Sequence, residues 1–250
     1  MDKVIAILQA RMHSERLPGK ILADLAGKPL ILHVIERLQG TPGVDRVVMA
    51  VPRTETAYLA PLAERAGAEI IGGAFNDVLG RFYQAAKRYP APYVIRATGD
   101  NPLLDTTMLE RCIQECQTGC WDMVGASNLP LGTGAEVFPA SLLDYLHHFG
   151  RKSHHREHVT SLLYEHEDEF RVCRLDTPPE LRAPEFRLTV DADEDLELMR
   201  RIYDRLYVPG KLVDLADAVR MLRDEPGLAE INRHVRQRDW RKDSIAASVA

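Results

Sequence analysis

Short apolar runs alternate with helix-like segments through the first hundred residues, and this alternation constrains the fold more than any other feature. The run over 3–8 is short, apolar and rich in β-branched residues, which predicts a buried strand. Strands separated by helices predict an α/β fold, a parallel sheet with right-handed crossovers. The expected strands are 3–8, 44–51, 70–71 and 93–98, and the expected helices between them are 29–39, 54–66 and 76–89.

The rest of the chain continues with both kinds of element, without a repeat or a clear linker. We expect one domain over residues 1–250, with a peripheral insertion at about 125–185 and a helical tail at about 211–250. Asn76 or Asp77 is available as the N-cap of one helix, and Asp105 as the N-cap of another. The remaining expected strands are 123–124, 136–138, 170–175 and 186–190, and the remaining expected helices are 105–116, 141–149, 154–167 and 193–206.

Composition excludes several classes of protein. The net charge of -5 argues against a dedicated nucleic-acid binder, which would present a basic face. No apolar run approaches the roughly 20 residues that span a bilayer, and the N-terminus shows no signal-peptide pattern, so we expect a cytoplasmic protein. Cys112, Cys116 and Cys120 share a helical stripe but form no Cys-x-x-Cys pair, which favours buried free thiols over a metal or redox role.

A basic loop follows the first strand. It carries Arg11, Arg16 and Lys20, the hydroxyl of Ser14 and a Pro18-Gly19 turn. A loop at the carboxyl end of a central strand directs backbone N–H groups and cations to one point, and a triphosphate suits such a site. The loop has neither the Walker A nor the Gly-x-Gly-x-x-Gly spacing. A solvated surface loop is the alternative interpretation.

Two acidic turns are candidates for a metal site. Asp100 follows the strand at 93–98, and Asp191 ends the apolar run at 186–190. Magnesium takes one or two protein carboxylates and completes its octahedron with water and phosphate oxygens. Asp193 fits a helix N-cap, and Asp193, Glu194 and Asp195 would then serve only the helix start. The same alternative, turn or cap residues, applies to Asp100 and Asp191.

The run from Gln9-Ala10-Arg11 to Arg16-Leu17-Pro18-Gly19-Lys20 resembles the nucleotide-binding signature of the sugar-acid cytidylyltransferases, the CMP-KDO and CMP-acylneuraminate synthetases. The whole chain is most similar to the branch of the spore coat polysaccharide biosynthesis protein F. The resemblance implies a three-layer, Rossmann-like, nucleotide-diphospho-sugar transferase fold, with a mostly parallel sheet and helices on both faces. It also implies that Arg11, Ser14, Arg16 and Lys20 surround the phosphates of CTP.

The resemblance extends to the acidic turns and to the base-binding region. Gly99-Asp100-Asn101-Pro102 and Thr189-Val190-Asp191 are similar to the metal-binding turns of the family, which implies Mg²⁺ on Asp100 and Asp191. The family usually has Thr-Pro where this chain has Ala192-Asp193. The further nucleotide-binding residues that the resemblance implies are Leu8, Gln9, Ala10, Asp77, Arg81, Thr98 and Gly99.

The acceptor side is less well specified. The resemblance implies an acceptor pocket containing Asn128, Glu136, Arg156 and His158, within the insertion that would also mediate a homodimer. Gly134 stands where relatives usually have an acidic residue, which leaves the acceptor unidentified. His154 and His158 have a spacing that chelates metals on a helix, although a solvated helix start explains them as well.

The function implied is Mg²⁺-dependent transfer of CMP from CTP to an acidic sugar or sugar-like acceptor, with release of pyrophosphate, in cell-surface polysaccharide or glycan precursor synthesis. Arg11, Arg16, Lys20 and Asp100 are the expected catalytic residues. Two alternatives remain open. One is a nucleotide-sugar-dependent glycosyltransferase, for which Asp191-Ala192-Asp193 provides an Asp-x-Asp string. The other is a nucleotide-binding protein without catalysis on the same fold.

Overall fold

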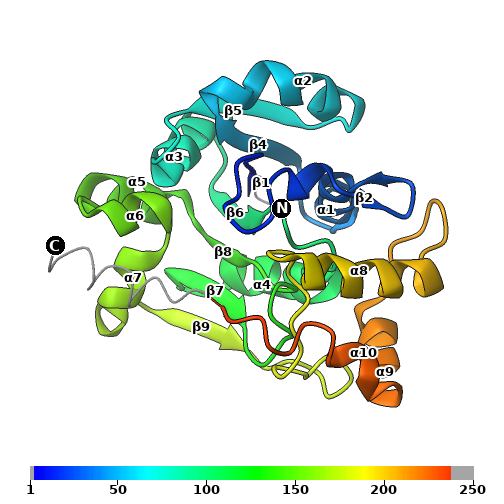
Figure 1. The fold of residues 1–250 in the computed structure, drawn as a ribbon. Coiled ribbons are helices and arrows are strands. Elements are labelled where there is room, and N and C mark those ends of the chain that lie inside the picture. Colours follow the sequence, from blue (N-terminus) through cyan, green and yellow to red (C-terminus); the bar gives the residue numbers. More distant parts are fainter. Residues whose placement is uncertain (1–2, 238–250) are drawn as a thin grey trace, which may run out of the picture.

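A seven-stranded sheet forms the centre of the computed structural model, which describes residues 3–237 (Figure 1). Its strands are β1 (Val4–Gln9), β4 (Arg46–Pro52), β5 (Glu69–Gly73), β6 (Tyr93–Thr98), β7 (Met123–Ala126), β8 (Glu136–Pro139) and β9 (Val172–Leu175). The order is β5-β4-β1-β6-β8-β7-β9, and β8 runs antiparallel to β6 and β7, whereas the other neighbours are parallel. A separate small hairpin joins β2 (Asp24–Leu25) to β3 (Lys28–Pro29).

β1 lies inside the sheet and is buried on both faces. Val4, Ala6 and Leu8 point into one hydrophobic core, whereas Ile5 and Ile7 point into the other. Successive side chains of a strand alternate between faces, so an uninterrupted apolar run fits only a strand that is covered on both sides. The buried packing of β1 therefore fixes the position of the residues that follow it, at the carboxyl end of the strand.

Helices cover both faces of the sheet, as the three-layer prediction requires (Figure 1). The Val4 face packs against α1 (Leu30–Gly40), α2 (Thr56–Arg65), α4 (Thr106–Thr118), α8 (Asp193–Leu206) and α9 (Leu215–Asp224). The Ile5 face packs against α3 (Val78–Arg88), α5 (Ala140–Phe149) and α7 (Ser161–Glu165). The remaining short helices are α6 (Ser153–Glu157), α10 (Pro226–Ala229), η1 (Lys20–Leu22), η2 (Arg53–Glu55) and η3 (Glu167–Glu169).

Two of the three predicted N-caps are confirmed. The Asp77 carboxylate accepts a hydrogen bond of 2.8 Å from the N–H of Gly80, and the Asp105 carboxylate accepts one of 2.7 Å from the N–H of Met108. The prediction for Asp193 is wrong, because Asp193 is exposed and is the first residue of α8. Asp195 reaches back instead and accepts from the N–H groups of Asp191 (2.9 Å) and Ala192 (3.1 Å).

Two predicted elements are wrong in form. Residues 186–190 form no sheet strand, because their backbone pairs with a loop: the N–H of Leu188 donates to Leu131, and the N–H of Val190 donates to Asp100. The helix predicted over 154–167 breaks into α6 and α7, because His158 has an extended conformation. The expectation of three buried thiols is confirmed for Cys112 and Cys116 and is wrong for Cys120, which is exposed. Burial raises the pKa of Cys112 and of Cys116 to about 12.

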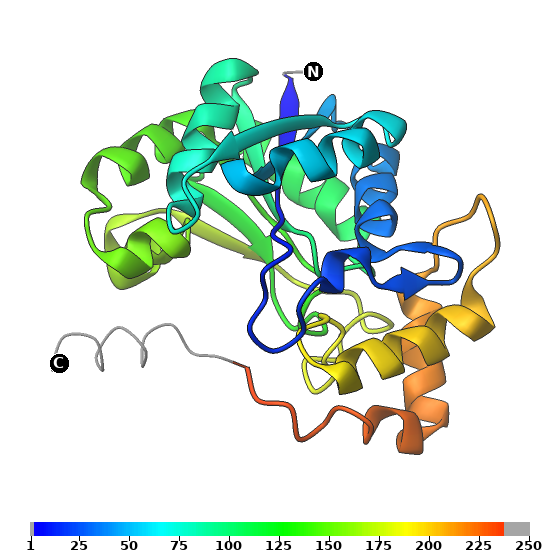
Figure 2. The same ribbon diagram turned by 45° about the horizontal axis from the view of Figure 1, so that its top comes forward.

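The C-terminal segment returns to the centre of the molecule. After α10 the chain runs back beneath the loop that follows β1 (Figure 2). The part of the expected helical tail beyond residue 237 lies outside the described residues. Within the described part, no helix has the length and apolar character that a membrane crossing requires.

Candidate active site

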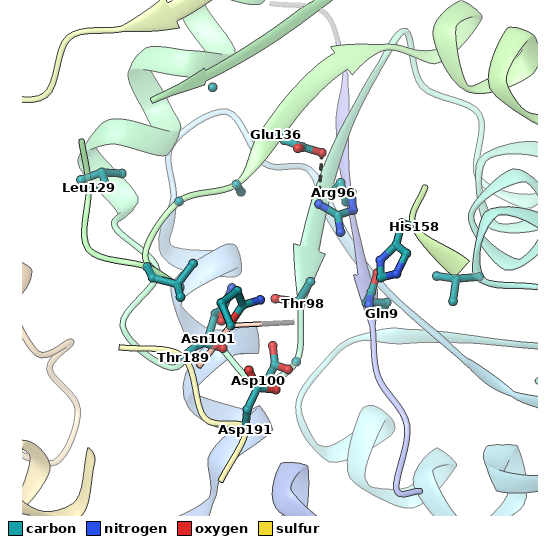
Figure 3. A pocket seen from close by; sticks show the side chains of 18 of the residues that line it. Gln9, Arg96, Thr98, Asp100, Asn101, Leu129, Glu136, His158, Thr189 and Asp191 are labelled. Atoms are coloured by element: carbon teal, nitrogen blue, oxygen red, sulfur yellow. Dashed lines mark hydrogen bonds and ion pairs between the residues drawn. The ribbon is translucent and has the colours of Figure 1, made fainter. Parts of the chain in front are cut away.

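A cavity of about 600 Å³ opens at the carboxyl ends of β1 and β6 (Figure 3). Its walls come from the loop after β1, the turn over 98–101, the segment over 125–136 and the extended segment that carries Thr189 and Asp191. Ligands of open parallel sheets bind beyond the carboxyl ends of the strands, because loops and helix starts converge there. The fold therefore places this cavity where an α/β protein normally binds its ligand.

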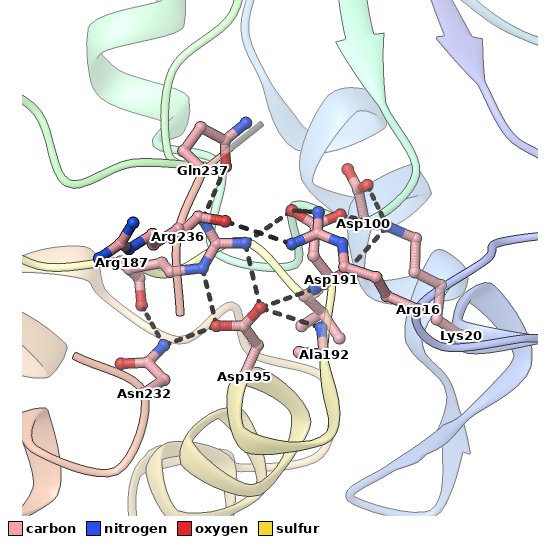
Figure 4. A network of polar contacts seen from close by, with 11 residues as sticks. Arg16, Lys20, Asp100, Arg187, Asp191, Ala192, Asp195, Asn232, Arg236 and Gln237 are labelled. Carbon is pink, nitrogen blue, oxygen red and sulfur yellow. Dashed lines mark hydrogen bonds and ion pairs between the residues drawn. The ribbon is translucent and has the colours of Figure 1, made fainter. Parts of the chain in front are cut away.

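Asp100 and Asp191 converge on the side chain of Lys20 at the base of this cavity (Figure 4). The Nζ of Lys20 donates to Asp100 Oδ2 at 2.5 Å and to Asp191 Oδ1 at 2.8 Å. It also donates to the carbonyl oxygen of Val190 at 2.9 Å. One buried ammonium thus joins two carboxylates that are far apart in the sequence.

The charges in this cluster stabilise one another. Burial lowers the pKa of Lys20, but Asp100 and Asp191 outweigh burial, and the pKa is raised above its ordinary value. Burial raises the pKa of Asp191, but Lys20, Arg16 and Arg187 outweigh it, and the pKa is lowered. Asp191 is therefore a carboxylate and Lys20 an ammonium at neutral pH.

The other cations of the loop after β1 lie along the same side of the cavity. Arg16 forms an ion pair of 3.2 Å with Asp191. Arg11 forms a weaker pair of 3.4 Å with Glu157, and its guanidinium lies 5.9 Å from the ring centre of Phe75. Ser14 also lines this wall. The loop therefore offers three positive charges and a hydroxyl to an anion in the cavity.

The two carboxylates fit a hard divalent cation. Such a cation takes oxygen ligands, and the Asp100 and Asp191 oxygens lie close enough together to share one ammonium. Lys20 contacts the same oxygens, so a cation bound between them would compete with its Nζ. Asn101 adds a neutral oxygen, Oδ1, beside the pair.

Four buried polar atoms without a hydrogen-bond partner in the described part of the chain belong to residues of the cavity wall. Among residues 3–237, the buried side-chain nitrogen and oxygen atoms without a hydrogen-bond partner are Gln9 Oε1, Arg81 Nε, Arg96 Nε and Asn101 Oδ1. All four residues line the cavity. Buried polar groups without a partner are costly and rare, so their gathering around one cavity marks this region as a candidate functional site.

Glu136 lies at the other end of the cavity from Asp100 and Asp191 (Figure 3), and both of its carboxylate oxygens accept hydrogen bonds. Its Oε1 accepts from the Tyr164 hydroxyl at 2.7 Å, and its Oε2 accepts from Thr160 at 2.9 Å and from Arg96 at 3.2 Å. Burial, followed by the charge of Glu136, raises the pKa of Tyr164, which therefore stays a hydrogen-bond donor. Glu136 orients Arg96 toward the cavity, where His158 forms the neighbouring wall (Figure 3).

Most of the site residues expected from the sequence meet in this cavity, and three do not. Leu8 is fully buried in the core. Asp77 and Arg156 form an ion pair of 3.5 Å with each other, away from the cavity lining. The expected residues that line the cavity are Gln9, Ala10, Arg11, Ser14, Arg16, Lys20, Arg81, Thr98, Gly99, Asp100, Asn128, Glu136, His158 and Asp191.

Sequence reasoning missed several polar residues of the cavity. Arg96 is a cation within an otherwise apolar strand, which is a signal that could have identified it. Asn101 and Thr189 are direct neighbours of the acidic turns and could have been included with them. Arg174 and Tyr164 carry no comparable signal, because only the folding of β9 and α7 brings them to the cavity.

The histidine-rich segment forms a different cluster from the expected one. His158 lies outside α6, so the helical pair of His154 and His158 does not form. His154 Nε2 and His155 Nε2 instead contact the two oxygens of Glu165 at 2.5 Å and 3.0 Å, and these three side chains could hold a metal ion. Lys152 also contacts Glu165, at 3.0 Å. These contacts join α6 to α7 beside the cavity.

Comparison with known proteins gives a family match and several relatives. The chain matches the family model for cytidylyltransferases over residues 5–215. It is 31% identical over 244 residues to an uncharacterised protein of Methanocaldococcus jannaschii, covering 96% of this chain and 98% of that protein. It is 33% identical over 211 residues to the spore coat polysaccharide biosynthesis protein SpsF of Bacillus subtilis, covering 82% and 88%. A solved structure of a cytidylyltransferase from Leptospira borgpetersenii superimposes with a TM-score of 0.83 at 27% identity, covering 92% and 97%.

Proposed function

This chain belongs to the cytidylyltransferase family, and on that premise we propose that it transfers the CMP group of CTP to a hydroxyl of an acidic sugar or sugar-like acceptor, with release of pyrophosphate. The convergence of Asp100 and Asp191 on Lys20 at the carboxyl end of β1 is the observation that carries the proposal. It brings two candidate metal ligands and the cationic loop together at one cavity.

In the proposed reaction the acceptor hydroxyl attacks the α-phosphorus of CTP, the new phosphorus–oxygen bond forms, and the bond to pyrophosphate breaks. Positioning and charge neutralisation supply most of the catalysis in such transfers. Arg11, Arg16 and Lys20 lie where they can bind the phosphate oxygens. The hydroxyl proton leaves to solvent.

Asp100 and Asp191 would hold Mg²⁺, which when bound supplies positive charge to the phosphates and lowers the pKa of a coordinated hydroxyl. A cation on the oxygens that Lys20 contacts would compete with its ammonium for them. A phosphate oxygen is a suitable new partner for its ammonium, because the two charges attract at short range in a buried site. Lys20 would thus hold the carboxylates together before the nucleotide binds and contact the nucleotide afterwards.

We assign the end of the cavity near Glu136 to the acceptor. Arg96 and His158 lie toward this end (Figure 3), and Asn128 is a further polar residue of the lining. A guanidinium in the cavity wall suits a carboxylate on the acceptor. The name of the Bacillus subtilis relative supports an acceptor from cell-surface polysaccharide synthesis. The homodimer, the cytoplasmic location and the single domain with a peripheral insertion stay predictions.

The glycosyltransferase alternative has less support. It would use Asp191-Ala192-Asp193 as an Asp-x-Asp ligand pair, but the Asp193 side chain is exposed on α8 and does not line the cavity.

An acceptor screen tests the proposal. The protein is incubated with CTP, Mg²⁺ and a panel of sugar acids and smaller hydroxy acids, and pyrophosphate and CMP-linked product are measured. Pyrophosphate release with formation of a CMP-linked acid is the expected result. Release of a nucleoside diphosphate from a nucleotide sugar would favour the glycosyltransferase, and CTP binding without turnover on any acceptor would favour a protein that only binds the nucleotide.

A further inference from the structure

Arg187 lies next to Asp191, and each of its guanidinium nitrogens is hydrogen-bonded (Figure 4). The side chain is 8% exposed and does not line the cavity. Its Nε donates to Asp195 Oδ1 at 2.9 Å, and its Nη2 donates to Asp195 Oδ2 at 3.1 Å. The same Nη2 also donates to Asp191 Oδ2 at 2.6 Å. Arg187 therefore contacts two residues of the cavity lining, Asp191 and Gln237, and of these only Asp191 is a candidate metal ligand.

The partners of Arg187 are themselves fixed. Asp195 is 1% exposed, and its Oδ2 also accepts from the backbone N–H groups of Asp191 and Ala192. Asn232, in the C-terminal segment, donates to Asp195 Oδ1 at 2.8 Å and to the carbonyl oxygen of Arg187 at 3.0 Å. The Oε1 of Gln237 accepts a hydrogen bond of 2.6 Å from the Nη1 of Arg187. A planar guanidinium held in this way has little freedom to rotate.

The consequence falls on the two oxygens of Asp191. Oδ2 is taken by Arg187 and by Arg16, whereas Oδ1 accepts a hydrogen bond from Lys20, which also contacts Asp100. Of these two cations Arg187 is the more buried, with 8% of its side chain exposed against 30% for Arg16. We propose that Arg187 is a positioning residue that reserves Oδ2 of Asp191, leaves only Oδ1 for a cation, and thereby sets which divalent ion the site prefers.

The choice of ion follows from the ligand chemistry. Ca²⁺ takes six to eight oxygens and often both oxygens of a carboxylate, whereas Mg²⁺ and Mn²⁺ suit sites that offer few protein oxygens and leave the rest to water and phosphate. An aspartate with one reserved oxygen disfavours the larger ion. The inference rests on the proposed function, because it concerns the same carboxylates and a nucleotide-bound cation.

The test measures metal binding rather than turnover. The protein is saturated with a CTP analogue that has a methylene group in place of the α–β bridging oxygen. Mn²⁺ is then titrated in, free Mn²⁺ is measured by electron paramagnetic resonance, and bound Mn²⁺ is displaced with Ca²⁺. In Arg187→Lys, which keeps the charge but loses the fork, we expect Mn²⁺ affinity to fall about 10-fold and the Mn²⁺/Ca²⁺ preference to fall by a similar factor.

Asn232→Ala is the second variant, because it removes two hydrogen bonds that fix Asp195 and Arg187 without removing either side chain. A smaller shift in the same direction is expected, which keeps the test decisive if Arg187→Lys does not fold. Arg182→Lys is the control. Arg182 pairs with Asp176 on the surface, so this substitution should leave the ion preference unchanged.

The outcomes separate the two proposals. An unchanged Mn²⁺/Ca²⁺ preference in a folded Arg187→Lys protein, or in Asn232→Ala if the first variant is unfolded, overturns the inference and leaves the proposed function standing. An equal shift in Arg182→Lys overturns it as well. If the unaltered protein binds the analogue without any divalent ion at this site, the metal-dependent function fails and the inference falls with it.

Discussion

The backbone N–H of Val190 donates a hydrogen bond of 2.9 Å to the carbonyl oxygen of Asp100. This bond joins the turn after β6 directly to the extended segment that precedes α8. Asp100 and Asp191 are therefore held together by the backbone as well as by the ammonium of Lys20. The acidic pair belongs to the folded framework, and its side chains are oriented before a ligand arrives, which is the arrangement that favours catalysis by positioning.

Replacing Lys20 by Met should remove the charge that both carboxylates share. We expect the rate of pyrophosphate release to fall about 100-fold, as for the loss of one charged donor at a transferring group. The melting temperature should also fall and should recover more on addition of Mg²⁺ than that of the unaltered protein, because the cation can replace the ammonium. Lys87→Met is the control, since Lys87 forms an exposed pair with Asp144. Turnover at the normal rate in Lys20→Met would show that this ammonium does not act on the phosphates.

Replacing Gly132 by Ala should distort the segment that carries Thr189. Gly132 has a φ of +93°, and an added Cβ would lie 2.5 Å from the backbone nitrogen of Thr189. We expect a loss of about 3 kcal/mol in the free energy of unfolding, measured by urea denaturation, because strain and overlap act together. For Gly227→Ala, where nothing lies within 4 Å of the added Cβ, a change within about 0.5 kcal/mol is expected. Equal stability of the two variants would be evidence against this packing.

Glu165 should make stability depend on pH in the acid range. Burial raises its pKa, but hydrogen bonds from His155, Lys152 and His154 outweigh burial and lower it to about 2. A carboxyl group with a depressed pKa in the folded state stabilises the protein above its unfolded pKa of 4.5, and this contribution is lost as pH falls from 4.5 toward 2.

Solvent screening at this partly exposed site limits the contribution of Glu165 to the free energy of unfolding to about 1 kcal/mol. In Glu165→Gln, the free energy of unfolding should be lower at pH 6 and should fall less steeply below pH 4.5. Urea denaturation at several pH values measures both quantities. Identical pH profiles for the two proteins would mean that the Glu165 cluster does not form in solution.

Glu136→Gln should affect the acceptor more than the nucleotide. The amide cannot accept hydrogen bonds at both of its terminal atoms, so the contacts from Arg96, Thr160 and Tyr164 cannot all persist. We expect the KM for the acceptor to rise about 10-fold, with little change in the KM for CTP, because Arg96 loses its orientation. Steady-state kinetics with each substrate varied in turn makes the comparison, and Glu110→Gln serves as a surface control. A rise confined to the KM for CTP would contradict the assignment of this end to the acceptor.

The fold was largely accessible from the sequence, because burial on both faces produces an uninterrupted apolar strand such as β1. The rule that ligands bind beyond the carboxyl ends of parallel strands placed Asp100 beside the basic loop. The strand expected over 186–190 does not form. The backbone of this segment makes its hydrogen bonds with a neighbouring loop, which the rule does not predict. Spacing also suggested a continuous helix over 154–167, which the structure interrupts at His158.

The least accessible part of the site was the support beneath Asp191. In the sequence, Arg187 fits a strand, Asp195 fits a helix start and Asn232 fits a polar tail, so none of them stands out. Their association depends on a C-terminal segment that returns to the centre of the fold, and local patterns do not report such long-range contacts. Arg156 shows the converse case, since its motif suggested the acceptor pocket and the structure pairs it with Asp77. Its role at the acceptor stays a prediction without geometric support.

The most direct measurement of the central claim is calorimetric titration of CTP into the unaltered protein, Asp100→Asn and Asp191→Asn, each with and without Mg²⁺. The account predicts that Mg²⁺ strengthens CTP binding in the unaltered protein and that each substitution, with the fold intact by circular dichroism, removes this enhancement. The same Mg²⁺ enhancement in both variants as in the unaltered protein would contradict the claim that the two aspartates bind one nucleotide-associated cation.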